Sequence, residues 1–289
     1  MKKRKNKIID IILLVVIIIC IFNIANSLYH IFEWKNDGDD IRKQVDEIYD
    51  ITKPTEVIER RSESSDEKEI IDDNIEIIEM DEKPDEYNPY WAYINMNLIN
   101  VDFYDLKEVN KDTVGWIQVN GTNVNYPFVQ TTDNSYYLTH AFNKKYNSAG
   151  WVFLDYRNNS KLTDNNNIIY AHGRYDSTMF GSLRKALTNG WLKNTDNYII
   201  KISTPYENTM WQVFSLYKIP TTSDYLKINF NNDDDFSQFT SMLINRSEHD
   251  FNTTISGSDR IITLSTCYDE SQRVVIHAKL IKKETKTDY

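Results

Sequence analysis

The chain has 289 residues, 40% of them hydrophobic and 13% aromatic, so it is long enough for one substantial packed domain and an appendage. Its formal net charge of −10 argues against nucleic acid as a main partner, because phosphate binding requires a basic face. The five histidines are scattered and the two cysteines, Cys20 and Cys267, lie far apart, so the sequence predicts neither a metal site nor a disulfide scaffold.

The N-terminus has the pattern of a membrane anchor. A basic segment at 1–7 precedes an apolar run at 8–26, in which Asp10 is the only charge. About 18 apolar residues at 1.5 Å each span about 27 Å, close to the hydrocarbon thickness of a bilayer. The basic segment should stay in the cytoplasm, which places the C-terminus outside. A cleaved signal peptide is the alternative, since the small residues "ANS" follow at 25–27, but the apolar run is longer than a usual signal core.

The next segment, 27–88, is predicted to be an acidic extracellular spacer. It is dense in Glu and Asp and poor in aromatics, which is typical of a solvated linker, with a short helix at 39–51. Helical spacing returns at 90–110 and predicts a short helical lead-in to the main domain.

Residues 89–289 are predicted to form a mainly β domain with helical insertions. The "NG" pair at 120–121 indicates a hairpin, and helical patterns interrupt the strands at 178–187 and 233–247. Eight short strands with hairpin links favour a closed barrel or a sandwich. The expected strands are 114–119, 123–131, 150–156, 166–172, 197–204, 210–219, 260–267 and 273–282.

Cys267 ends one of these strands, and Arg273 begins the next after five residues. In a hairpin the two side chains would be near cross-strand neighbours. A guanidinium beside a sulfur stabilises the thiolate, which is the nucleophilic form, and can also face the oxyanion formed when a thiolate attacks a carbonyl. The competing interpretation is a buried structural cysteine that acts as a small hydrophobe.

Acyl transfer also needs a proton donor for the leaving amine. His172 is the best candidate because it ends the strand 166–172 and precedes a glycine. His140 lies among aromatic residues and is interpreted as structural, and His277 as a packed or partly exposed sheet residue. His249 follows a polar helix and His30 belongs to the membrane-proximal stretch, so neither is favoured.

Three motifs together resemble the sortase family of cysteine transpeptidases. They are "TLSTC" at 263–267, "RVVIHAKL" at 273–280 and "IIYAHG" at 168–173. The resemblance implies an eight-stranded sortase-type barrel preceded by N-terminal helices. It also implies that Cys267 is the nucleophile, His172 the general acid and base, and Arg273 the residue that stabilises the oxyanion.

Class B is the most similar branch of this family. The segments 150–158 and 179–187, the helix at 234–247 and the helical lead-in all resemble that class. The connection between the cysteine and the arginine is shorter than in several class B relatives, where the loop helps to wall the acceptor side.

The resemblance implies a two-step exchange on the extracellular side of the cell membrane. The enzyme would cleave a Thr-containing C-terminal sorting signal of a secreted protein, form a thioacyl enzyme, and pass the protein to an amine of a cell-wall precursor or of a pilin. No metal or organic cofactor is implied. Ser265, Thr266 and Tyr268 are candidate substrate-binding residues, although ordinary packing roles explain them equally well. A cysteine peptidase that releases its product to water and a non-catalytic surface adhesion module are the alternatives from other classes.

Overall fold

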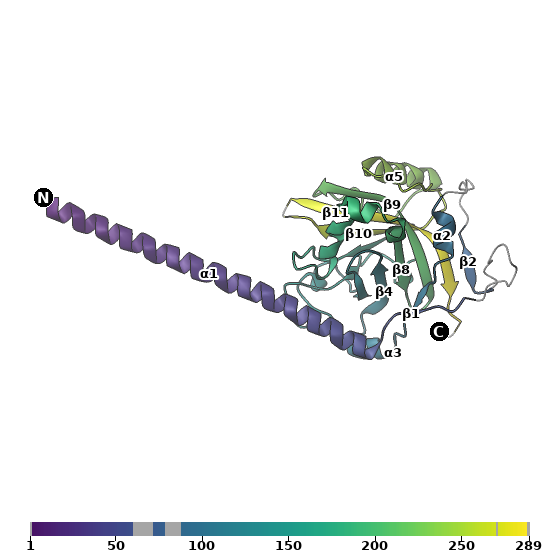
Figure 1. Ribbon diagram of the computed structural model, residues 1–289, viewed down its shortest axis with the longest axis horizontal. Coiled ribbons are helices and arrows are strands. Elements are labelled where there is room, and N and C mark those ends of the chain that lie inside the picture. Colours follow the sequence, from purple (N-terminus) through teal and green to yellow (C-terminus); the bar gives the residue numbers. More distant parts are fainter. Residues whose placement is uncertain (1, 60–71, 79–87, 270, 288–289) are drawn as a thin grey trace.

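The computed structural model describes residues 2–59, 72–78, 88–269 and 271–287, with side chains from residue 10 onward. The side chains of the predicted basic segment 1–7 lie outside the described residues, as do 60–71 and 79–87 of the predicted acidic spacer. Within the described part, a long helix projects from a β-barrel (Figure 1).

The barrel is one sheet closed on itself. Its strands follow the order β10-β7-β6-β5-β4-β8-β9-β11, and pairing of β10 with β11 closes the ring. The short strand β2 (Ile75–Ile77) adds to the distal part of β11, beyond the point where β10 has ended. The predicted eight-stranded barrel is therefore confirmed. Its strands are β4 (Thr113–Val119), β5 (Asn125–Val129), β6 (Phe153–Leu154), β7 (Asn166–Tyr170), β8 (Ile199–Ser203), β9 (Glu207–Pro220), β10 (Ile261–Cys267) and β11 (Gln272–Thr285).

Short elements surround the barrel. A second, two-stranded sheet pairs β1 with β3. These elements are β1 (Thr55–Glu56), α2 (Tyr90–Ile94), β3 (Ile99–Asn100), α3 (Tyr104–Val109), η1 (Tyr136–Leu138), η2 (Phe180–Leu187), α4 (Asn189–Leu192) and η3 (Thr195–Tyr198).

The insertion predicted as a helix at 178–187 is the 3₁₀ helix η2. Its side chains Phe180, Leu183 and Ala186 are fully buried, which is a spacing of three residues. A 3₁₀ helix has three residues per turn, so this spacing puts all three side chains on one face, whereas an α-helix would spread them.

The helix α5 (Asp233–Arg246) covers the outside of the barrel and confirms the second helical insertion. The side chain of Asn232 caps its N-terminus by accepting a hydrogen bond from the Asp235 backbone N–H. Phe236 and Leu243 of α5 pack in one cluster with Ile261 of β10. Ile262 and Leu264 of β10 point the other way, into the main core, so the two faces of β10 alternate as the sequence predicts.

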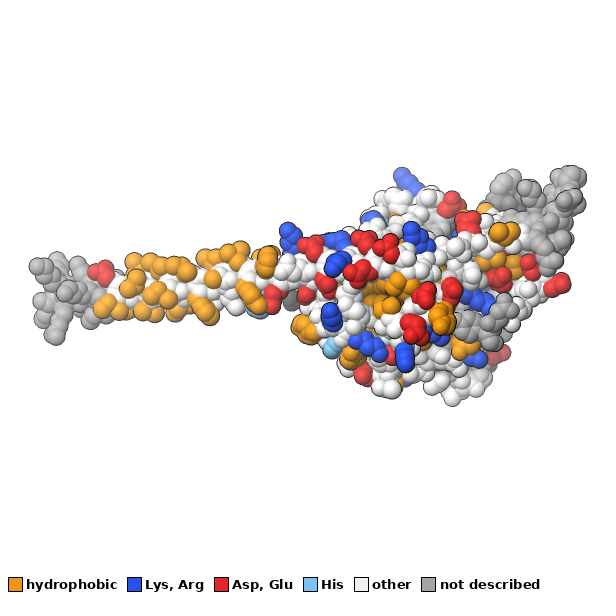
Figure 2. All heavy atoms as spheres, turned by 90° about the horizontal axis from the view of Figure 1, so that it is seen from below, with side chains coloured by type: hydrophobic (Ala, Val, Ile, Leu, Met, Phe, Trp, Pro, Cys, Tyr) orange, Lys and Arg blue, Asp and Glu red, His pale blue; other side chains and the backbone are white. Residues whose placement is uncertain are grey.

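The helix α1 (Lys2–Ile51) combines two environments in one element. Its first part is fully exposed and is long and apolar enough to cross a membrane. Figure 2 shows this part as an orange rod, while charges of both signs cover the domain. Its last part lies on the barrel, where Ile41, Gln44 and Ile48 are buried. The segment predicted as a solvated spacer thus packs on the domain over this stretch.

Candidate active site

Cys267 and Arg273 lie directly opposite each other at one rim of the barrel. They form the last registered pair of β10 and β11. Both side chains are half-buried, which leaves them accessible from solvent. The connecting turn is tight, because the Tyr268 backbone N–H donates to the Gln272 carbonyl at 2.9 Å. The cross-strand neighbourhood expected from the sequence is present.

His172 reaches the same rim by a different route. The strand β7 runs parallel to β10, with Tyr170 paired with Ser265, so both strands end at the same edge. His172 lies two residues beyond Tyr170, and Cys267 lies two residues beyond Ser265. Parallel strands of equal rise carry these two residues to the same height. The hydroxyl of Thr266 donates to the Ala171 carbonyl at 2.8 Å, and this hydrogen bond links the ends of β10 and β7.

One ring nitrogen of His172 has a backbone hydrogen-bond partner. Nε2 lies 2.8 Å from the Leu138 carbonyl oxygen. Because a carbonyl only accepts, Nε2 must carry the proton, which leaves Nδ1 as the nitrogen able to exchange one. Within the described residues no hydrogen bond joins this imidazole to the Cys267 thiol.

The candidate substrate-binding residues have different surroundings. Ser265 and Thr266 are buried, and Thr266 supports the strand ends as described above. Tyr268 is partly buried against the core, and its ring lies 4.6 Å from Lys218 Nζ. Of the three, Tyr268 is the one at the mouth of the turn.

Tyr225 belongs to this region although no sequence motif pointed to it. Its hydroxyl lies 3.0 Å from the hydroxyl of Ser265, on the face of β10 that carries Cys267. Burial raises the pKa of the Tyr225 phenol, while the hydrogen bond to Ser265 and the positive charge of Arg273 oppose that rise. Tyr225 therefore lies within electrostatic range of the predicted site.

The other histidines of the domain have structural partners. His140 stacks on Tyr136 with ring centroids 4.0 Å apart. His249 Nε2 lies 2.7 Å from the Tyr198 hydroxyl. His277 is fully buried in the sheet. Each of the three thus has a packing environment, and His172 remains the candidate at the rim.

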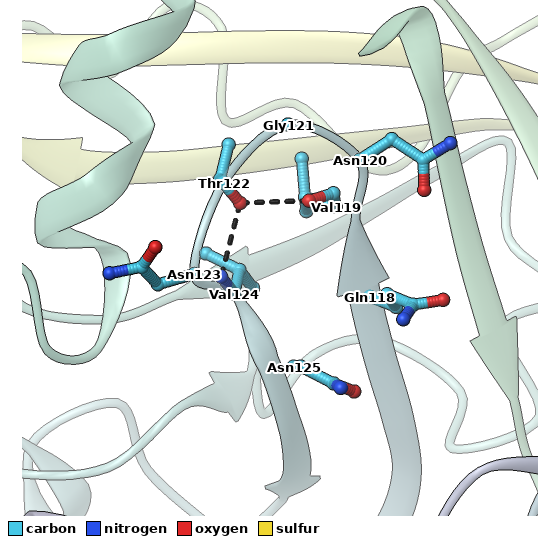
Figure 3. A pocket seen from close by; sticks show the side chains of 8 residues that line it. All are labelled: Gln118, Val119, Asn120, Gly121, Thr122, Asn123, Val124 and Asn125. Atoms are coloured by element: carbon cyan, nitrogen blue, oxygen red, sulfur yellow. Dashed lines mark hydrogen bonds between the residues drawn. The ribbon is translucent and has the colours of Figure 1, made fainter. Parts of the chain in front are cut away.

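Among the described residues no group of three or more His, Cys, Asp or Glu side chains could hold a metal ion. A pocket does occur at the turn between β4 and β5; residues 118–125 line it, and none of the predicted site residues is among them (Figure 3). There the Thr122 hydroxyl donates to the Val119 carbonyl and accepts from the Val124 N–H. The Thr122 hydroxyl is thus used to hold the turn, and the lining offers no thiol, imidazole, carboxylate or amine.

Comparison with known proteins decides the family. The sortase domain model matches residues 117–281, which run from the end of β4 through most of β11. The chain belongs to the sortase family. It is accordingly a sortase-type cysteine transpeptidase, as its motifs predicted.

Sortases of class B are its relatives. Sortase B of Staphylococcus aureus is 36% identical over 188 residues, covering 64% of this chain and 76% of the relative. Sortase B of Listeria monocytogenes is 38% identical over 184 residues, covering 62% and 74%. The solved S. aureus sortase B–substrate complex is 38% identical, with a TM-score of 0.58, and covers 62% of this chain and 84% of that one. The class B prediction is confirmed, and this sortase has the fold of those structures.

Proposed function

We propose that this sortase is a membrane-anchored transpeptidase whose reacting groups are Cys267, His172 and Arg273. The observation that supports this assignment is the strand pairing: β10 pairs in parallel with β7 and in antiparallel with β11, so three separate strands deliver the three side chains to one rim. All three are half-buried, so a peptide can reach them.

The first step forms a thioester. The thiolate of Cys267 attacks the carbonyl carbon after a threonine in a C-terminal sorting signal. The resulting oxyanion faces the guanidinium of Arg273. In this step the Cys267 thiol has given its proton to Nδ1 of His172, so the imidazole is a cation, and Nδ1 passes that proton to the leaving amine as the peptide bond breaks. The products are the thioacyl enzyme and the free C-terminal fragment.

The second step transfers the acyl group. An amine of a peptidoglycan precursor or of a pilin attacks the thioester and loses a proton to His172, and the Cys267 thiolate leaves. A solved structure of a sortase B complexed with triglycine supports a peptide amine as acceptor. The S. aureus substrate complex likewise supports a peptide donor. Ser265 and Thr266 support the end of β10 beneath the donor peptide, and Tyr268 borders the peptide-binding site.

The N-terminal part of α1 is proposed to anchor the enzyme. Residues 8–26 cross the membrane, the basic residues 1–7 remain in the cytoplasm, and 89–289 form the catalytic domain on the extracellular side. The exposed apolar stretch of α1 supports this arrangement. Residues 27–88 connect the two and include the part of α1 that packs on the barrel.

One experiment tests the proposal. The full chain in detergent micelles is incubated with a library of Thr-containing pentapeptides, with and without triglycine, and mass spectrometry identifies adducts on Cys267. The expected result is a thioacyl adduct that triglycine discharges into a peptide product, and that Cys267→Ala does not form. Discharge to water at the same rate without the amine would indicate a peptidase instead. Absence of any adduct would contradict both.

A further inference from the structure

Arg184, a residue of η2, lies between the segment that follows His172 and the turn that follows Cys267. Its Nη2 donates to the Gly173 carbonyl at 2.6 Å and to the Tyr268 carbonyl at 2.6 Å, with the Cys267 carbonyl at 3.3 Å. Its Nη1 donates to the Arg174 carbonyl at 3.2 Å. One guanidinium thus joins the backbone just after His172 to the backbone at and after Cys267.

A planar cation with several donors is well suited to these four carbonyl oxygens. Carbonyl oxygens that converge from two chain segments repel each other through their partial negative charges. A planar guanidinium has five N–H donors in a fixed fork and can satisfy several such oxygens at once. Aromatic rings hold the group from the sides: the carbon Cζ of Arg184 lies 4.6 Å from the Tyr175 ring centroid and 5.6 Å from that of Tyr268.

The position of Arg184 is itself fixed by the fold. Leu183 and Ala186, on either side of it in η2, are fully buried, while the Arg184 side chain is half-buried. The sequence pattern of η2 therefore anchors the base of the side chain and directs its head toward the rim.

We propose that Arg184 is a positioning residue that holds the backbone after His172 against the backbone around Cys267 and so sets the separation of imidazole and thiol. Within the described residues no hydrogen bond joins imidazole and thiol directly, so their separation depends on the two loops. A displacement of about 1 Å at a reacting group can cost about 10²-fold in rate. The inference rests on the proposed roles of His172 and Cys267.

The test compares Arg184→Gln, Arg184→Lys and the control Lys185→Gln. Lys185 is exposed, and its Nζ donates to the Asn123 side chain at 3.1 Å. The control therefore removes a positive charge one residue away from Arg184. Each full chain, in detergent micelles, is assayed with the donor peptide found in the library screen. The measurements are kcat and KM for thioacyl formation, the fraction of Cys267 alkylated by iodoacetamide, and the melting temperature.

For Arg184→Gln we expect kcat to fall by about 10- to 100-fold with KM within about twofold of wild type. Alkylation carried to completion should label the same fraction of Cys267, because its final extent depends on access to the sulfur and not on the imidazole. Arg184→Lys should recover only part of the rate. Its ammonium keeps the positive charge but lacks the planar fork that reaches both segments. Lys185→Gln should stay within about twofold of wild type.

Three results would overturn the inference: a wild-type kcat in folded Arg184→Gln, an equal loss in Lys185→Gln, or a loss of rate that matches the loss of folded protein. Failure of both Arg184 variants to fold would also overturn it, because Arg184 would then be a residue of general stability. A wild-type enzyme that forms no thioacyl adduct would refute the proposed function, which is a separate outcome.

Discussion

At Arg273 the direction of the donors matters as much as the charge. The residue lies directly across from Cys267, and its Nη1 donates to the Gln272 carbonyl at 3.2 Å, which leaves other N–H groups of the fork for an oxyanion. A lysine at this position would carry the charge but not the planar pair of donors.

We therefore expect Arg273→Lys to be nearly as damaging as Arg273→Ala. Loss of one oxyanion donor typically costs about 10²- to 10³-fold in kcat. The rate of thioacyl formation at saturating peptide measures the effect. A lysine variant with near-normal activity would argue against the proposed role of the guanidinium.

His277 is the histidine whose burial has a thermodynamic consequence. Its Nδ1 lies 2.8 Å from the Thr263 hydroxyl and its Nε2 lies 2.8 Å from the Tyr217 hydroxyl. Burial, with a smaller contribution from the Arg246 charge, lowers the pKa of His277 from 6.5 to about 3. The folded state therefore keeps this imidazole neutral in a pH range where the unfolded chain protonates it.

This difference predicts that the domain loses stability as the pH falls below about 6.5. Between the two pKa values the unfolded state binds more protons, so the free energy of unfolding decreases by about 1.4 kcal/mol per pH unit from this group. Between pH 7 and pH 5 the loss should be about 2 kcal/mol. His277→Gln cannot be protonated and should lack this contribution, whereas His249→Gln should keep it. Urea unfolding followed by tryptophan fluorescence at the two pH values measures it, and equal pH dependence in His277→Gln and wild type would refute the prediction.

At the scale of elements, the strands were predictable because each has a local pattern. All eight barrel strands lie at the predicted places, since alternation and turn residues are properties of neighbouring residues. The type of η2 was not predicted, because a spacing of three over one short segment becomes meaningful only when its partners are known. The continuity of α1 was missed because a change from apolar to acidic composition suggested a boundary. However, no proline occurs before Pro54, and Ile41, Gln44 and Ile48 repeat at helical spacing.

Some contacts of the candidate site follow from local sequence, and others do not. The pairing of Cys267 with Arg273 follows from a short hairpin connection, which local sequence reveals. The approach of His172 depends on the parallel pairing of β7 with β10, which joins residues almost 100 positions apart. Local pattern cannot reveal that pairing, and the motif resemblance supplied it. Tyr225 lies in none of the motifs, and Arg184 lies in the segment 179–187 that resembles class B but was not singled out there; both were found from their contacts.

Gly173, between β7 and η2, lies close against the backbone of Cys267. A Cβ added there would lie 1.8 Å from the Cys267 carbonyl oxygen and 2.9 Å from the Thr266 hydroxyl oxygen. Because the nearer atom belongs to the backbone, a larger residue forces one of the loops to move.

Gly173→Ala should therefore separate the loops. We expect a destabilisation of about 1–3 kcal/mol, as for other overpacked sites. We also expect a fall of about 10²-fold in thioacyl formation, since the displaced residues flank the reacting groups. Gly190→Ala is the matched control, because its Cβ would meet only the Thr188 hydroxyl oxygen at 3.9 Å. Equal activity and melting temperature in both variants would contradict the steric argument.

At the scale of the whole molecule, α1 joins the proposed anchor to the loop that follows His172. Arg174, two residues after His172, donates to the Trp34 carbonyl at 2.7 Å, and its guanidinium carbon lies 4.5 Å from the Trp34 ring centroid. Trp34 follows the proposed span by eight residues, or about 12 Å of helix. With the proposed anchor in place, the rim that carries Cys267 is thus expected to lie close to the membrane surface.

Because α1 provides both the proposed anchor and contacts with the domain, two truncations should have different outcomes. Removal of residues 1–30 deletes most of the exposed apolar part of α1, leaving Ile31 and Phe32, and keeps Trp34 and the buried residues, so the fragment should be soluble and active. Removal of residues 1–51 also deletes Ile41 and Ile48, which are 0% and 3% exposed. Burial of two such side chains stabilises by about 3–6 kcal/mol, so the shorter fragment should melt at a clearly lower temperature.

Thermal melts and thioacyl formation on both fragments check this expectation. Ile41→Ala in the longer fragment should reproduce part of the loss, by about 2–5 kcal/mol, because it removes one of the buried contacts without changing the length of the chain. An insoluble longer fragment would mean that the packed part of α1 depends on the span. Equal melting temperatures in the two fragments would mean that the contacts between α1 and the barrel do not stabilise the domain, and the catalytic unit would then begin after Ile51.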